Sequence, residues 1–191
     1  MTFPKRFGII SAVINMEQEN ARQIAAVIRD FRLPRYQEIP NVGLYLEQAS
    51  KYIGEYLSPL GDFSLTPSMI SNYVKKGLIP NPVKKQYGRD QVAYLFFIAV
   101  SKSVLSLDAL AVFLRLQQRT YPLQRAYDYF CDEFENILQF TFEVQDCMEL
   151  RGEDSSDEKR LLYTCIVAAV QKIYLEDCLK SISHSEDDAA G

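Results

Sequence analysis

Tryptophan is absent from this chain of 191 residues, and histidine occurs once, as His184 in a polar C-terminal stretch. A histidine base must be held against a nucleophile and an orienting group, and no Ser/His/Asp or Cys/His arrangement can be built around this residue. The chain also lacks a glycine-rich phosphate loop and a dinucleotide fingerprint. We therefore expect a protein that is not an enzyme, and the sequence indicates no cofactor.

Cysteine is scarce and widely spaced. The four cysteines lie 13 to 18 residues apart and form no CxxC pair. A zinc site needs closely grouped thiolate or imidazole ligands, so we expect no metal site. We interpret the cysteines as small buried hydrophobes in a reducing cytosol. They are Cys131, Cys147, Cys165 and Cys178.

Long hydrophobic runs are missing as well. The apolar runs at 7–14 and 91–100 are each about ten residues or shorter, which is too short to cross a membrane. No small-residue cleavage site follows the first run, so it is not typical of a signal peptide. We expect a cytoplasmic protein without membrane contact.

Charge is distributed unevenly along the chain. The net charge is −4, yet residues 64–102 hold six basic side chains and one acidic one, a balance of +5. Residues 128–191 hold five basic and sixteen acidic side chains, a balance of −11. This asymmetry indicates one basic face and one acidic region. The acidic groups at 132, 133 and 135 and at 153, 154, 157 and 158 are interpreted as solvated faces.

Apolar residues recur at helical spacing through most of the chain, which predicts an all-α fold with a small β-wing at most. The predicted helices cover 17–31, 44–57, 67–76, 91–100, 107–117, 123–148 and 160–182. We divide the chain into an N-terminal arm and helix (1–43), a helix-turn-helix domain (44–117), a C-terminal helical region (118–183) and a disordered tail (184–191).

The stretch 65–95 carries the clearest local signals. Thr66 is a suitable N-cap and Pro67 suits the first helical position. Gly77 suits the residue after a helix end, and 83–87 can form a strand-like wing before Asp90 opens the next helix. This order is typical of a helix-turn-helix followed by a short wing.

The same stretch supplies the candidate DNA contacts. Four residues of the 67–76 helix would face the major groove, and five further residues would contact the DNA backbone. The groove residues are Ser68, Ser71, Asn72 and Lys75, and the backbone residues are Lys76, Lys84, Lys85, Tyr87 and Arg89. The alternative is that Lys75 and Lys76 only complement the helix dipole, while Lys84 and Lys85 form a solvated turn.

Two sequence segments carry a family resemblance. Residues 70–80 (ISNYVKKGLIP) followed by 87–95 (YGRDQVAYL) resemble the MerR-type winged helix-turn-helix, and 106–114 (SLDALAVFL) resembles the helix that follows in that family. Together with 33–46, the chain resembles a bacterial domain-of-unknown-function family with a MerR-like core. The resemblance covers about 33–116 and implies a regulator that binds double-stranded DNA. The chain departs from the MerR pattern at Ser71, where that family usually has arginine.

The C-terminal helices at 123–148 and 160–182 are expected to form a helical hairpin that dimerises or encloses a small apolar ligand. A homodimer would double the contacts of a short helix-turn-helix on a palindromic site. The aromatic stripe of the first helix is interpreted as core. Two functions remain open: a MerR-like transcriptional regulator, and a protein-interaction module that uses the same fold without binding DNA.

Overall fold

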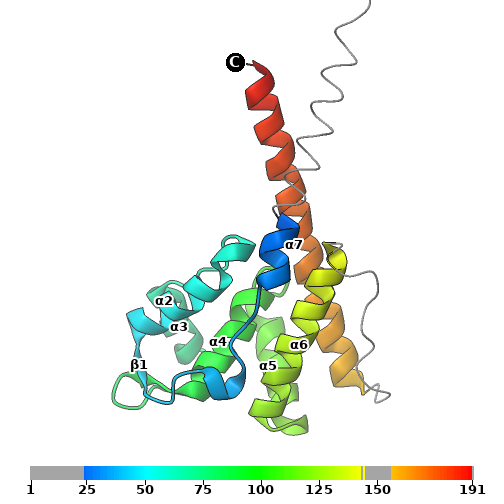
Figure 1. The fold of residues 1–191 in the computed structure, drawn as a ribbon. Helices are drawn as coiled ribbons and strands as arrows, with labels where there is room; N and C mark the ends of the chain where they lie inside the picture. Colours follow the sequence, from blue (N-terminus) through cyan, green and yellow to red (C-terminus); the bar gives the residue numbers. More distant parts are fainter. Residues whose placement is uncertain (1–23, 143, 145–155, 191) are drawn as a thin grey trace, which may run out of the picture.

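The computed structural model describes residues 24–142, 144 and 156–190 (Figure 1). The described chain is mostly helical, which confirms the all-α class. The helices are 24–30, α2 (Leu46–Leu57), α3 (Pro67–Lys75), α4 (Arg89–Ser101), α5 (Leu107–Thr120), α6 (Leu123–Thr141) and α7 (Asp157–Ala190), with 3-10 turns η1 (Tyr36–Glu38) and η2 (Ser58–Leu60). Two short strands, β1 (Leu44–Tyr45) and β2 (Gln86–Tyr87), pair antiparallel.

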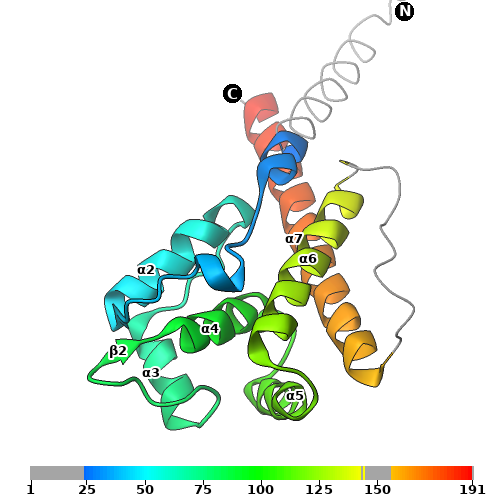
Figure 2. The ribbon, with the colours of Figure 1, turned by 60° about the horizontal axis from the view of Figure 1, so that its bottom comes forward.

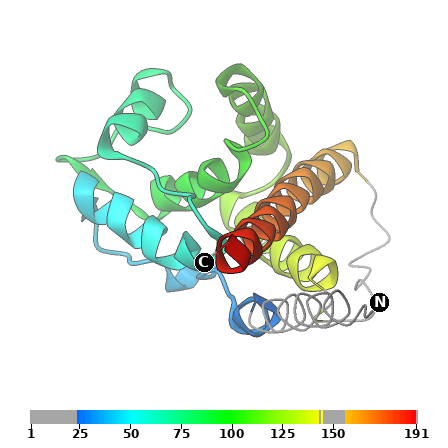
Figure 3. The same cartoon turned by 90° about the horizontal axis from the view of Figure 1, so that it is seen from above.

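Helix α4 is the centre of the molecule. Every side chain from Val92 to Val100 is buried, as its apolar sequence predicts. Helices α2 and α3 lie on one side of it, and α6 and α7 lie on the other (Figures 1 and 3). Because α4 contacts both groups of helices, the N-terminal and C-terminal parts share one hydrophobic core.

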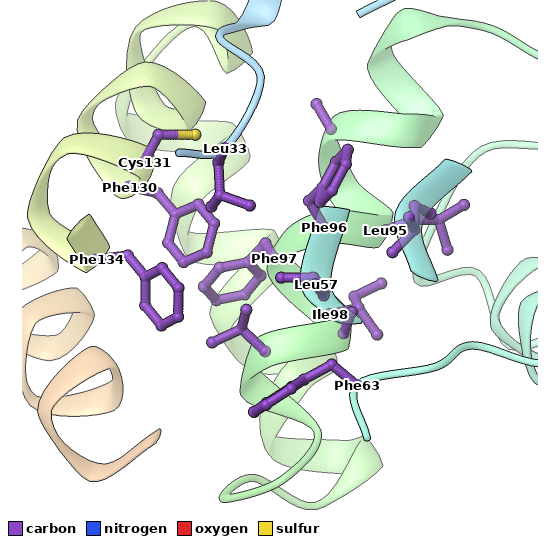
Figure 4. Close-up of a cluster of buried hydrophobic side chains, with 14 of the residues drawn as sticks. Leu33, Leu57, Phe63, Leu95, Phe96, Phe97, Ile98, Phe130, Cys131 and Phe134 are labelled. Atoms are coloured by element: carbon purple, nitrogen blue, oxygen red, sulfur yellow. The ribbon is translucent and has the colours of Figure 1, made fainter. Parts of the chain in front are cut away.

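The aromatic stripe of α6 belongs to this core (Figure 4). Phe97 of α4 meets Phe130 edge to face, with ring centroids 5.4 Å apart. Phe130 in turn stacks on Phe134 at 5.9 Å. Cys131 and Cys165 are buried among apolar groups, as predicted, and burial raises the pKa of both thiols. Cys147 lies outside the described residues.

Several boundaries differ from the sequence prediction. Helix α6 ends at Thr141 with Phe142 as its C-cap, before the predicted end at 148. Helix α7 begins at Asp157 and continues to Ala190, so the backbone is helical where we expected a disordered tail. No glycine or proline interrupts residues 157–190. The predicted helix at 17–31 is present over 24–30, and its earlier part and the 7–14 run lie outside the described residues.

Helices α6 and α7 pack against each other but do not form the predicted hairpin. The Lys159 ammonium lies 5.3 Å from the ring centre of Tyr129, near the start of both helices. The rings of Phe142 and Tyr174 meet at 5.3 Å, towards the far end of α6 and further along α7. The two helices therefore run parallel, as Figure 1 also shows.

Acidic side chains of α6 hold the segment that precedes η1. The Arg35 guanidinium donates to both carboxylate oxygens of Glu135, at 2.6 and 2.7 Å, and to Asp132 at 2.8 Å. The Leu33 N–H donates to Glu135, and the Tyr36 N–H donates to Asp128. The prediction of a solvated acidic face was wrong here, because these carboxylates satisfy the backbone and the arginine of a distant segment.

Among the described residues, no helix combines the length and apolarity needed to cross a membrane.

Candidate nucleic-acid interface

Helix α3 has well-defined ends. The Thr66 hydroxyl accepts a hydrogen bond from the Met69 N–H at 3.2 Å, and Pro67 occupies the first helical position. At the other end, the Gly77 N–H bonds to the Val74 carbonyl and the Leu78 N–H bonds to the Tyr73 carbonyl, both at 2.9 Å. Gly77 has φ +71°, so these bonds form a Schellman motif that needs glycine.

The two faces of α3 differ sharply in burial. Ile70 and Tyr73 are buried on the face towards α2 and the core. The opposite stripe is exposed and consists of the four predicted groove residues, Ser68, Ser71, Asn72 and Lys75. Their spacing of three and four residues places these side chains on one face of the helix. Lys76, the C-cap residue, is exposed as well.

Nine residues, 58–66, connect α2 to α3, which is longer than the three- or four-residue turn of a simple helix-turn-helix. The connection is nevertheless fixed, because Leu60, Phe63 and Leu65 are buried. The Ser50 hydroxyl donates to the Leu65 carbonyl, and the Lys102 ammonium donates to the Ser64 carbonyl at 2.7 Å. Lys102 is thus used internally and does not add to an exposed basic surface.

The predicted wing is a two-residue turn. Val83 and Gln86 exchange two backbone hydrogen bonds, at 3.0 and 2.9 Å, and Lys84 and Lys85 lie between them. These lysines have φ values of 50° and 66°, so both are left-handed, as in a type I′ turn. A type I′ turn favours asparagine at the first of these positions and glycine at the second, and this chain has lysine at both. The turn therefore presents two exposed ammonium groups at a conformational cost.

Strand β2 attaches this turn to the start of α2. Leu44 pairs with Tyr87 and Tyr45 pairs with Gln86. A Cβ added to Gly43 would lie 2.6 Å from the Gln86 Cβ, so this pairing requires glycine at position 43. Figure 2 shows α3 and β2 at the same end of the molecule, on the side away from α6 and α7.

Two of the nine predicted contact residues have their partners inside the protein. Tyr87 is only 4% exposed and belongs to the core. The Arg89 guanidinium donates to the Ile39 carbonyl at 3.0 Å and to the Gln37 Oε1 at 2.8 Å. It also lies 5.5 Å from the ring centre of Tyr36, so Arg89 holds η1 against the start of α4.

The same cluster explains the start of α4. Its N-cap is Gly88, whose N–H donates to the Gln91 Oε1 at 2.6 Å, while Asp90 lies in the first turn and accepts from the Tyr36 hydroxyl. Burial and the bond to Asp90 raise the pKa of Tyr36 to about 12. The Gln91 amide also donates to the Asn81 carbonyl at 3.0 Å, which ties the loop before the wing to α4. The glycine–glutamine spacing was the available signal for this cap, and the sequence prediction did not use it.

All four predicted lysines remain available to a ligand. Lys75, Lys76, Lys84 and Lys85 are exposed, and none of them has a carboxylate partner within the part of the chain that the structure describes. With Ser68, Ser71 and Asn72 they form a polar and cationic surface, here called the α3–wing surface. Its chemistry suits phosphate groups together with the hydrogen-bonding edges of bases.

Comparison with protein families finds a match over residues 34–130 to the family described as Domain of unknown function (DUF1836). The match covers α2 to α5, the η1 segment that Arg89 holds, and the first part of α6. Comparisons with curated proteins and with solved structures find no match.

Proposed function

The chain belongs to the DUF1836 family, whose description names no activity, and from its surface chemistry we propose that it is a DNA-binding transcriptional regulator of MerR-like type. In this proposal α2 and α3 form the helix-turn-helix, and the turn at 83–86 is the wing. Helix α3 enters the major groove, and the wing lies along the adjacent phosphates.

One observation carries the proposal: the exposed face of α3 is polar and cationic, and the only charges of the nearby turn are two exposed lysines. Ser71 and Asn72 can hydrogen-bond to base edges, since both lie mid-helix on the exposed stripe. Lys75, Lys76, Lys84 and Lys85 can neutralise phosphates, because among the described residues no acidic group pairs with them. A turn that places two lysines in a costly conformation is consistent with a functional need for charge there.

We further propose that the protein acts as a cytoplasmic homodimer. Helix α7 extends beyond the other helices in Figure 1. Leu175 and Leu179 on this part of α7 are 57% and 55% exposed. They are four residues apart and so lie on one face of the helix, whereas exposed apolar residues on a monomer are usually scattered singly. Pairing of two copies through α7 would cover these side chains and give two α3–wing surfaces for a palindromic site.

The most informative experiment selects bound fragments from a pool of genomic DNA, because it tests the activity and yields the target together. We expect enrichment of a small set of fragments that share a sequence with two-fold symmetry. The Asn72→Ala variant should alter the preference at one position, whereas Lys84→Ala with Lys85→Ala should weaken binding to all fragments about equally.

The alternative function is a protein-interaction module on the same fold, which the overall charge of −4 favours. It predicts no salt-sensitive binding of any fragment in the micromolar range. The selection above therefore separates the two functions, because only a regulator gives enriched fragments whose recovery falls when the wing lysines are removed.

A further inference from the structure

A cavity of about 110 Å³ lies between α5, α6 and α7. Its walls are mainly apolar and aromatic. They include Phe113, Leu116, Tyr121, Ala126, Tyr129 and Leu162. A smaller cavity of about 50 Å³ adjoins it, because both are lined by Phe113, Gln117, Ala126 and Leu162. The smaller cavity reaches Tyr94 and Phe97 of α4.

One polar side chain lies where the two cavities meet. The Gln117 amide nitrogen donates to the Tyr121 carbonyl at 3.0 Å, which fixes the orientation of the amide group. The Gln117 Oε1 is buried and has no hydrogen-bond donor among the described residues. A buried acceptor without a donor is unfavourable, and native proteins rarely leave one so. A ligand group that donates a hydrogen bond at this point would satisfy the acceptor.

Three charged residues, Arg125, Glu158 and Lys159, line the larger cavity, and the Glu158 carboxylate accepts from the Thr120 hydroxyl at 3.4 Å. The Arg125 guanidinium lies 5.5 Å from the ring centre of Tyr121, and the Lys159 ammonium lies 5.3 Å from that of Tyr129. Both cations thus stack on the outer aromatic rings. The lining is mainly aromatic and aliphatic, and the Gln117 amide and the Glu158 carboxylate are among its few polar groups, which is the usual composition of a small-molecule site.

We propose that this cavity binds a molecule with a single aromatic ring and a hydroxyl or amino group that donates a hydrogen bond to the Gln117 Oε1. An apolar cavity of roughly 150 Å³ is enough to bind benzene, and the two adjoining cavities together offer a similar space. The donor on the ring distinguishes this ligand from a purely apolar one. This proposed ligand site does not depend on the proposed DNA binding.

Phenol and toluene test the proposal, because they have nearly the same shape and only phenol can donate. The full-length protein is titrated with each by NMR or calorimetry. We expect phenol to bind with a millimolar or lower Kd. In the Gln117→Leu variant the ratio of the toluene Kd to the phenol Kd should fall about tenfold, since the acceptor is gone. The Gln171→Leu variant is the matched control, because Gln171 is exposed on α7 outside the cavity, and its ratio should equal that of the wild type.

A second variant tests the location of the site. Ala126 lines both cavities, so Ala126→Leu should fill the shared space and abolish binding of phenol and of toluene. Circular dichroism checks that this variant is folded. If it is not folded, the ratio of the toluene Kd to the phenol Kd in Gln117→Leu tests the proposal instead. The proposal is overturned if phenol does not bind the wild type in the millimolar range, or if the toluene-to-phenol ratio is unchanged in Gln117→Leu.

Discussion

Lys84 and Lys85 combine a strained backbone with exposed charge on the α3–wing surface. Their φ values of 50° and 66° place both in the left-handed region. This region costs an ordinary residue about 1–2 kcal/mol, whereas Asn-Gly suits a type I′ turn. Stability and charge therefore favour different residues at these two positions.

Replacing the pair by Lys84→Asn with Lys85→Gly should separate the two effects. We expect the free energy of unfolding to rise by about 1–2 kcal/mol, because the turn conformation becomes favourable. DNA affinity should fall, because two phosphate contacts are lost. Urea denaturation measures the first effect and fluorescence anisotropy with labelled DNA measures the second.

The control for this change is Lys84→Ala with Lys85→Ala, which removes the charges and keeps the unfavourable conformation. It should lower DNA affinity as much as the Asn-Gly variant does, without raising the free energy of unfolding. A loss of stability in the Asn-Gly variant would show that the two lysines do not occupy a type I′ turn.

A second residue-scale prediction concerns Arg35. Its removal in Arg35→Ala should lower the free energy of unfolding by about 2 kcal/mol, because Glu135 and Asp132 lose their shared partner in a half-buried position. The comparison is Arg32→Ala, which breaks an ion pair with Glu38 whose side chains are 55% and 46% exposed. That variant should lose about 0.5 kcal/mol or less. Equal losses in urea denaturation would contradict the role given to Arg35.

At the scale of the element, the capping residues at the ends of α3 stabilise the helix that carries the exposed polar face. Gly77 has φ +71°, and an added Cβ there would meet no atom within 4 Å. Gly77→Ala should therefore lower stability by about 1 kcal/mol through backbone conformation alone. Gly54 also has open space around it but lies inside α2, so Gly54→Ala should raise stability by roughly 0.5–1 kcal/mol. Thermal unfolding of the two variants should give shifts of opposite sign; shifts of the same sign would contradict the Schellman motif at Gly77.

Elements defined by local signals could be predicted from the sequence. Thr66, Pro67 and Gly77 mark α3 correctly, and the uniformly apolar stretch at 91–100 marks the buried α4. The Ser106 hydroxyl accepts from the Ala109 N–H, as expected of an N-cap of α5. In each case the residues that determine the helix lie within the helix or directly beside its ends.

Features that depend on distant partners could not be predicted. The carboxylates of α6 look solvated in the sequence, because Arg35 lies about a hundred residues away from Glu135. Tyr87 and Arg89 looked like DNA contacts, since nothing local shows that one enters the core and the other binds the η1 segment. The parallel course of α6 and α7 likewise depends on packing between helices rather than on their own patterns.

At the scale of the whole molecule, the C-terminal half is acidic and the α3–wing surface is cationic, so the two ends of the protein differ in charge. Light scattering after size exclusion should give the mass of a dimer at tens of micromolar protein. Leu175→Glu with Leu179→Glu should shift the population towards monomer, because two like charges would enter the α7 pairing surface. A wild-type monomer at tens of micromolar would contradict the symmetric arrangement on DNA.

The central claim is that the α3–wing surface binds DNA, and a salt titration of DNA affinity tests it most directly. The logarithm of the association constant should fall linearly with the logarithm of salt concentration, with a slope of about −0.9 for each phosphate contacted. Lys84→Ala with Lys85→Ala should reduce the magnitude of this slope by about 2 per protomer, whereas Arg119→Ala with Arg160→Ala, which removes the same charge from the exposed surfaces of α5 and of the start of α7, should leave it unchanged. Absence of salt-sensitive binding in the micromolar range, or equal slopes for the wild type and the wing variant, would contradict the account.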